Sequence, residues 1–227
     1  MFVYRAFATC ALLVGLAGGA HATVMYNNLP PNATQAGLDS IADDGPDLYD
    51  SFSTGSTTTV KTVQLLLATS GNLGGSVVVD LYSNSPGNPN TPNAFVAAIG
   101  TVSDSILSGT AKLITFNVNI PVTASTRYWV GLTDNNSDSN NHSNIEWAYA
   151  TNANGVGVLN EYNDSDNFGS FLNGDGSFQG DFATSQPYMM CVSGGSGSGC
   201  LVPEPASLSV LGLGLLGLGF AFRRRIG

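Results

Sequence analysis

Short apolar runs with a period of two constrain the fold of this chain more than any other feature. In the run at 62–67, Val63, Leu65 and Leu67 alternate with Thr62, Gln64 and Leu66. Side chains two residues apart share one face of a β-strand, so this spacing predicts a strand with one face in a core. The same period recurs at 77–82, 114–118 and 127–132, and further strands are expected at 48–54, 95–102, 145–149 and 187–192.

The segments between these runs are rich in Gly, Pro, Asn, Asp and Ser, which favour turns. No window in this region has the apolar spacing of an amphipathic helix, so the crossover helices of a parallel sheet are not expected. The pattern therefore predicts an all-β domain of about eight strands, an antiparallel β-sandwich or jelly roll. The stretch 152–180 gives no clear strand pattern.

The N-terminus reads as a signal peptide. Arg5 supplies a positive charge, residues 6–19 are small and apolar, and Ala20-His21-Ala22 is a small-x-small cleavage pattern. Signal peptidase is expected to remove residues 1–22, and Cys10 with them.

The C-terminus reads as a membrane segment. Residues 206–222 carry no charge, and as a helix they would extend about 26 Å, close to the hydrocarbon thickness of a bilayer. Arg223, Arg224 and Arg225 follow, and such a cluster stays on the cytoplasmic side. The predicted organisation is a folded domain at 23–192 outside the membrane, a flexible Gly/Ser linker at 193–202 and a tail at 203–227.

The predicted exported part is strongly acidic. It retains three basic and fifteen acidic residues, for a net charge of −12. Nucleic acid is excluded as a partner, because its binding depends on Lys and Arg. Acidity of this kind is typical of an extracellular, soluble surface.

Two cysteines remain after signal removal, Cys191 and Cys200, on either side of a Gly/Ser run. In an oxidising compartment the pair can form a disulfide, which we favour over the alternative of two free thiols.

The tail resembles the PEP-CTERM sorting signal, on the order of its three parts: Pro203-Glu204-Pro205, a Gly/Leu-rich apolar segment and a terminal Arg cluster. The resemblance implies that an exosortase-type membrane protease recognises Pro203, Glu204 and Pro205. It also implies an intermediate anchored in the inner membrane, followed by release to the cell surface or the extracellular space.

The body is similar to the exported domains called choice-of-anchor, type R. The similarity lies in Ser51-Phe52-Ser53-Thr54, in 77–82 followed by Ser85-Pro86-Gly87, and in 124–130 ahead of Glu146-Trp147. Such domains occur with different anchoring signals, so this resemblance implies an exported surface domain without assigning an activity.

Catalysis is not expected. Nucleophilic triads need a histidine base, and His142 in an Asn/Ser-rich loop is the one histidine left after signal removal. A glycosidase needs two facing carboxylates, whereas Glu146 has the position of a solvated strand residue. No cofactor is expected, although Ca²⁺ could bind oxygen-rich loops that include Asp134, Asp138, Asp164 and Asp166, which otherwise form Asx turns.

Sugar binding would need an exposed aromatic platform. Tyr128 shares a strand face with Val130 and Leu132, and Trp147 and Tyr149 share one with Ile145, which marks all three as core residues. Trp129 falls on the opposite face and is the better candidate. The leading prediction is a structural or adhesive protein that associates with exopolysaccharide in a biofilm. The alternative is a carbohydrate-binding module, with or without Ca²⁺.

Overall fold

The computed structural model describes residues 24–41, 47–71, 74–86, 91–134, 144–151, 156–157, 168–172, 178–180, 187–194 and 200. The first strands are β1 (Val24–Asn27), β2 (Gln35–Ser40), β3 (Asp47–Ser53), β4 (Thr59–Thr69), β5 (Ser76–Asn84) and β6 (Pro92–Ser103). A single 3₁₀ turn, η1 (Asp104–Ile106), leads to β7 (Lys112–Pro121), β8 (Arg127–Asp134) and β9 (Ile145–Ala150). The remaining strands are β10 (Val156–Gly157), β11 (Phe168–Leu172), β12 (Phe178–Gly180) and β13 (Met190–Ser193).

The seven-stranded sheet is organised around β4, the central strand of this layer. Its order is β10-β1-β13-β4-β9-β2, and β7 pairs with the other edge of β4. All pairings are antiparallel, with Val63 of β4 opposite Val192 of β13 on one side and opposite Phe116 of β7 on the other.

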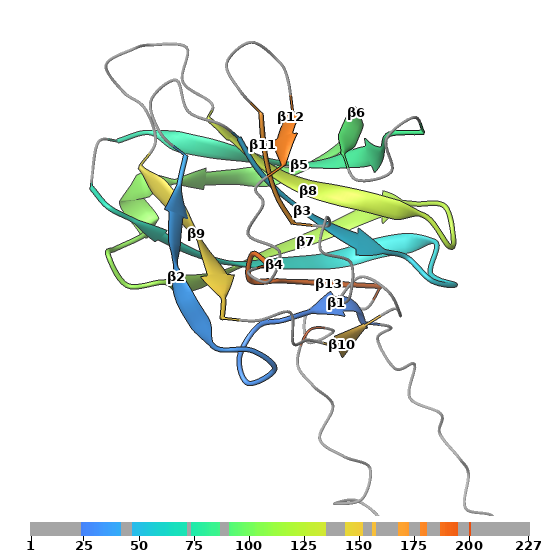
Figure 1. The fold of residues 1–227 in the computed structure, drawn as a ribbon, viewed down its shortest axis with the longest axis horizontal. Helices are drawn as coiled ribbons and strands as arrows, with labels where there is room; N and C mark the ends of the chain where they lie inside the picture. Colours follow the sequence, from blue (N-terminus) through green and yellow to red (C-terminus); the bar gives the residue numbers. More distant parts are fainter. Residues whose placement is uncertain are drawn as a thin grey trace, which may run out of the picture.

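The second sheet has six strands in the order β12-β11-β3-β8-β5-β6. Its pairs are also antiparallel, and β8 is central, between β3 and β5. In Figure 1, β3, β5, β6 and β8 lie in the upper layer, and β1, β4 and β13 lie below them.

One hydrophobic core joins the two layers. Val63, Leu65 and Leu67 of β4 belong to the same buried cluster as Val79 and Leu81 of β5. Because the central strands β4, β5 and β8 of the two sheets direct alternate side chains into this cluster, the sheets pack face to face, as in a β-sandwich. A smaller cluster covers part of the opposite, outer face of the seven-stranded sheet; its buried members are Leu29, Ala33, Ala148, Ala150, Met189, Cys191 and Cys200.

The all-β, antiparallel prediction is confirmed, and no α-helix occurs among the described residues. The strands expected at 48–54, 95–102 and 145–149 are present as β3, β6 and β9, with ends shifted by up to three residues. Two strands before residue 48 went unpredicted: β1 has consecutive buried residues, and β2 is mostly exposed, so neither shows alternation. Within 152–180, where no strand was assigned, the structure has β10, β11 and β12.

Candidate functional site

The end of the folded domain is closed by a disulfide. Cys191 lies on β13, and its Sγ is 2.14 Å from that of Cys200, with the two Cα atoms 5.8 Å apart. Met190 and Val192 on either side of Cys191 face the main core, so Cys191 points to the outer face of the seven-stranded sheet. The two cysteines are 0% and 5% exposed, and the disulfide is therefore part of the packed domain.

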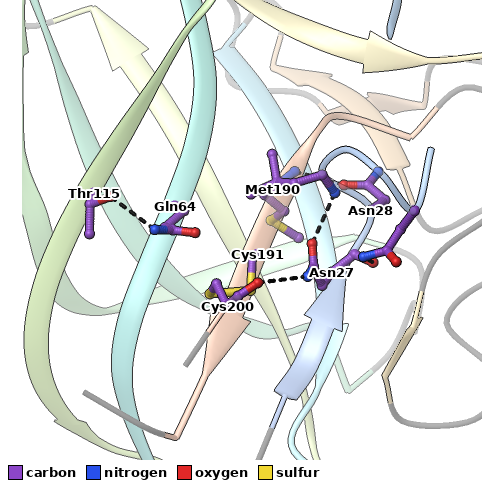
Figure 2. Close-up of a disulfide and its surroundings, with 9 residues drawn as sticks. Asn27, Asn28, Gln64, Thr115, Met190, Cys191 and Cys200 are labelled. Carbon is purple, nitrogen blue, oxygen red and sulfur yellow. Dashed lines mark hydrogen bonds between the residues drawn. A yellow bond between two sulfur atoms is a disulfide. The ribbon is translucent and has the colours of Figure 1, made fainter. Parts of the chain in front are cut away.

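Cys200 is also held by Asn27, a buried residue of β1. Asn27 donates a hydrogen bond from Nδ2 to the carbonyl oxygen of Cys200 at 3.0 Å, and its Oδ1 accepts one from the Leu29 N–H. Figure 2 shows this arrangement, with Asn27 beside the disulfide and Gln64 and Thr115 on neighbouring strands. We call Cys191, Cys200 and Asn27 the C-terminal clamp.

The neighbouring Asn28 fixes β1 to the strand that carries Cys191. Its Nδ2 donates to the Tyr188 carbonyl at 2.8 Å, and its Oδ1 accepts from the Met190 N–H at 2.7 Å. Asn28 is fully buried, so both amide groups have replaced water by backbone partners. These bonds hold the end of β1 against the segment that leads into β13 and Cys191.

The two cysteines of the clamp lie on either side of the Gly/Ser run within the predicted linker at 193–202. Ser193 is the last residue of β13 and is 0% exposed, and Cys200 is held against the domain. Both ends of the Gly/Ser run are therefore held by the domain, and Leu201 and Val202 alone separate Cys200 from Pro203. A pair of cysteines in the sequence suggested the link, whereas the position of Cys200 against β1 could not be inferred from it.

Trp129 is not the exposed platform that its position in the alternation suggested. It does lie opposite the core-facing Tyr128 and Val130, but it is 0% exposed, and its Nε1 donates to Asn84 Oδ1 at 2.8 Å. On this outer face Gly131 has no side chain, and a Cβ there would come within 2.4 Å of the Tyr49 ring and 2.8 Å of the Tyr82 ring. The Tyr49 and Tyr82 rings cover the outer face of β8, so Trp129 is buried although it points away from the core.

Among the side chains that the structure describes on this sheet, the exposed large aromatic one is Phe95 of β6, at 59% exposure. Tyr82 of β5 packs against it edge to face at a centroid distance of 6.3 Å and against Tyr49 at 5.4 Å. Tyr82 also hydrogen-bonds Asp80, but burial outweighs that bond and raises the pKa of the Asp80 carboxyl. Asp80 Oδ1 is buried without a hydrogen-bond partner.

Trp147 and Tyr149 lie where the alternation put them. Trp147 is fully buried, stacks on Tyr188 at 4.8 Å and donates from Nε1 to the Met189 carbonyl at 3.1 Å. Tyr149 is partly buried against the main core. Glu146, directly before Trp147, is half-buried, and burial raises the pKa of its carboxyl.

Most of the predicted calcium ligands and catalytic alternatives lie outside the described residues. This holds for Asp138, Asp164, Asp166 and His142, and of Asp134 the structure gives the backbone at the end of β8. Within the described ranges, no group of three or more His, Cys, Asp or Glu side chains is arranged to hold a metal ion.

The predicted sorting tail also lies outside the described residues, from Pro203, Glu204 and Pro205 to Arg223, Arg224 and Arg225, as does the predicted signal peptide at 1–22. In the part of the chain that the structure describes, no helix is long and apolar enough to cross a membrane.

Comparison with known families matches residues 201–225 to the PEP-CTERM protein-sorting motif. This motif indicates an exported protein that is processed by an exosortase at the membrane and then reaches the surface or the extracellular space. The match begins at the residue after Cys200, so the clamp and the sorting motif are contiguous. The similarity of the body to choice-of-anchor domains stays a prediction.

No curated protein matches the chain. Among solved structures, a chain from the structure of infectious bursal disease virus Gt strain is similar at 13% sequence identity and a TM-score of 0.26. The alignment covers 92% of this chain and 53% of the viral chain, so this chain spans about half of the viral one. A likeness this weak assigns no function.

Proposed function

We propose that this chain is a non-enzymatic structural or adhesive protein of the cell surface or extracellular matrix, associated with exopolysaccharide. Signal peptidase and an exosortase act on it in turn, and its C-terminal segment anchors it in the inner membrane between the two cleavages. The observation that carries the proposal is the PEP-CTERM motif at residues 201–225. A tail of this kind is a substrate for another protein's active site, so no catalytic role in this chain follows from it.

An adhesive role is supported by one side of the sandwich, which we call the edge strip (92–121). Among the described residues, the large apolar side chains that are exposed all lie on it: Phe95, Val96, Ile106 and Leu113. The strip contains the edge strand β6 and the strand β7, which pairs with β4. Edge strands offer backbone donors and acceptors to a partner.

The charge of the edge strip differs from that of the exported part as a whole. Its one acidic residue, Asp104, is 1% exposed, and its one basic residue is the exposed Lys112. The strip therefore presents an almost uncharged surface on an exported part of net charge −12, which reduces repulsion from acidic polymers.

The sorting role is tested in the organism. Replacing Pro203 and Glu204 by Ala should leave the full-length chain in the inner membrane, detected by fractionation and by mass. A matched Ser207→Ala variant keeps Pro203-Glu204-Pro205 and should be released normally. Release of the Pro203/Glu204 variant at the normal rate would show that the motif is not what the protease reads.

The adhesive role is tested by retention of the purified protein on isolated exopolysaccharide. Phe95→Asp places a charge at the most exposed apolar side chain of the strip and should reduce retention several-fold. Gln35→Glu adds the same charge at an exposed position of β2, outside the strip, and should be retained on the exopolysaccharide as well as the original protein is. Equal retention of both variants and the original protein would rule out the strip as the adhesive surface.

The carbohydrate-binding alternative is favoured by the corner that Tyr82 and Phe95 form, because an exposed aromatic ring can stack on the apolar face of a sugar. A glycan array with and without a calcium chelator separates the two proposals. Binding to one defined glycan, lost on Phe95→Ala, supports a binding module, and silence in both conditions supports a structural role.

A further inference from the structure

The C-terminal clamp limits how far the domain can move from its sorting tail. Pro203 follows Cys200 by three residues, and the predicted membrane segment begins at Ala206. Six residues at full extension reach about 21 Å beyond Cys200. Without the disulfide the free chain would begin after Gly194, and the twelve residues to Ala206 would reach about 42 Å.

The position of the clamp on the domain decides what this reach permits. Cys191 and Cys200 lie on the outer face of the seven-stranded sheet, away from the core shared with the other sheet. Two stacked sheets are about 10 Å apart, so with its outer side chains the sandwich is roughly 20 Å thick. The outer face of the six-stranded sheet is therefore on the far side from the point of attachment.

Part of the 21 Å reach is used inside the bilayer, because the headgroup region of one leaflet is roughly 6 Å thick. About 15 Å is left above the lipid surface, less than the thickness of the sandwich. The clamped domain cannot turn over to place the six-stranded sheet against the membrane. A chain with an open clamp has about 36 Å above the surface and can do so.

We propose that the C-terminal clamp makes the outer face of the seven-stranded sheet the membrane-facing side of the anchored intermediate. The six-stranded sheet, with Phe95 and Tyr82, then points away from the membrane toward extracellular partners. This inference rests on the membrane-anchored intermediate of the proposed function. The partner of this outer face is the lipid headgroup surface, because the chain that links Cys200 to the tail is too short to place the other sheet there.

Two exposed positions report the orientation. Asn117 of β7 lies on the outer face of the seven-stranded sheet, because Phe116 and Val118 beside it pack on the core. Ala98 of β6 lies on the outer face of the six-stranded sheet, because Ala97 and Ile99 beside it pack on the same core. Each is replaced by Cys in the chain from Thr23 onward, which lacks the predicted signal peptide and Cys10, and the new thiol is labelled with a fluorophore.

The labelled chains are reconstituted in vesicles of phosphatidylethanolamine and phosphatidylglycerol that contain headgroup-quencher lipids. Fluorescence of the Asn117→Cys chain should be quenched several-fold more than that of the Ala98→Cys chain. Equal quenching of the two chains in protein that floats with the vesicles would overturn the orientation but leave the anchored intermediate standing. A chain that does not float with the vesicles would overturn both.

Two changes separate the clamp from the fold of the domain. Cys191→Ser with Cys200→Ser opens the clamp, and it should bring the two quenching values close together. A Gly and Ser insertion between Cys200 and Leu201 can leave the disulfide intact and still lengthen the tether. It is chosen long enough to give the same reach of about 42 Å as the chain with an open clamp. It should have the same effect, and a difference in quenching that survives this insertion would refute the role of the clamp.

Discussion

Replacing Cys191 and Cys200 together by Ser should lower the free energy of unfolding by about 3.5 kcal/mol. The bond closes a loop with a sequence separation of 9, and loop-closure entropy for that length is worth about 2.6 kcal/mol. Once Cys200 is released, the hydrogen bond from Asn27 to its carbonyl is lost as well, which adds about 1 kcal/mol. For a domain of this size the melting temperature should fall by about 7–14 °C.

The assay is guanidinium unfolding of the full chain in mild detergent, followed by tryptophan fluorescence. Trp129 and Trp147 are both fully buried in different sheets, so their emission reports the loss of either layer. Asn27→Ala is the matched control: it keeps the disulfide and removes the hydrogen bond, and it should cost about 1–2 kcal/mol. A loss below about 1 kcal/mol in the double Ser variant would refute the reasoning, since it would mean that the bond does not restrict the unfolded chain.

Three further variants test the packing and the buried charge. Trp147→Ala should cost about 3–5 kcal/mol in the same assay because it removes the stack on Tyr188, and a loss similar to that of an exposed substitution would contradict its core position. Gly131→Ala should cost about 1–3 kcal/mol, because its Cβ would meet the Tyr49 ring at 2.4 Å; unchanged stability would mean that the rings move aside freely. Burial raises the pKa of Asp80 in the folded chain, so at a pH between the unfolded and the folded pKa the native state holds a proton that the unfolded chain has lost. The contribution of Asp80 to stability therefore falls as the pH rises from its unfolded pKa to its folded pKa. The melting temperature of Asp80→Asn relative to the original protein should therefore increase with pH across the acid range and then level off, and a pH-independent difference would show that the carboxyl is solvated.

The pattern of the sequence was sufficient for the strands whose two faces differ. In β4, β5, β7 and β8 every second side chain enters the core, and the apolar residues show that period directly. It failed for β1, where a register shift places Met25 and Tyr26 both in the core, and for β2, which lies at the edge of its sheet and is mostly exposed. A strand without two distinct faces leaves no period of two to detect.

Trp129 shows a second limit of the pattern. Alternation correctly gave the face of the sheet on which it lies, but exposure depends on the neighbours from other strands. Gly131 on its own strand, Tyr49 on β3 and Tyr82 on β5 decide how closely that face is filled. These contacts join residues far apart in the chain, so local sequence does not contain them.

The sequence by itself determined the β-rich fold, the pair of cysteines and the PEP-CTERM tail that marks the chain for export and processing. Each of these depends on residue types at short spacing, which a single sequence displays in full. Tertiary structure alone decided that Cys200 lies buried against β1 and that its carbonyl is held by Asn27, 173 residues away in the sequence. That contact exists because antiparallel pairing places β13 beside β1. Together with the disulfide it holds to the domain the far end of a Gly/Ser segment that has the composition of a flexible linker, at the residue directly before the sorting motif.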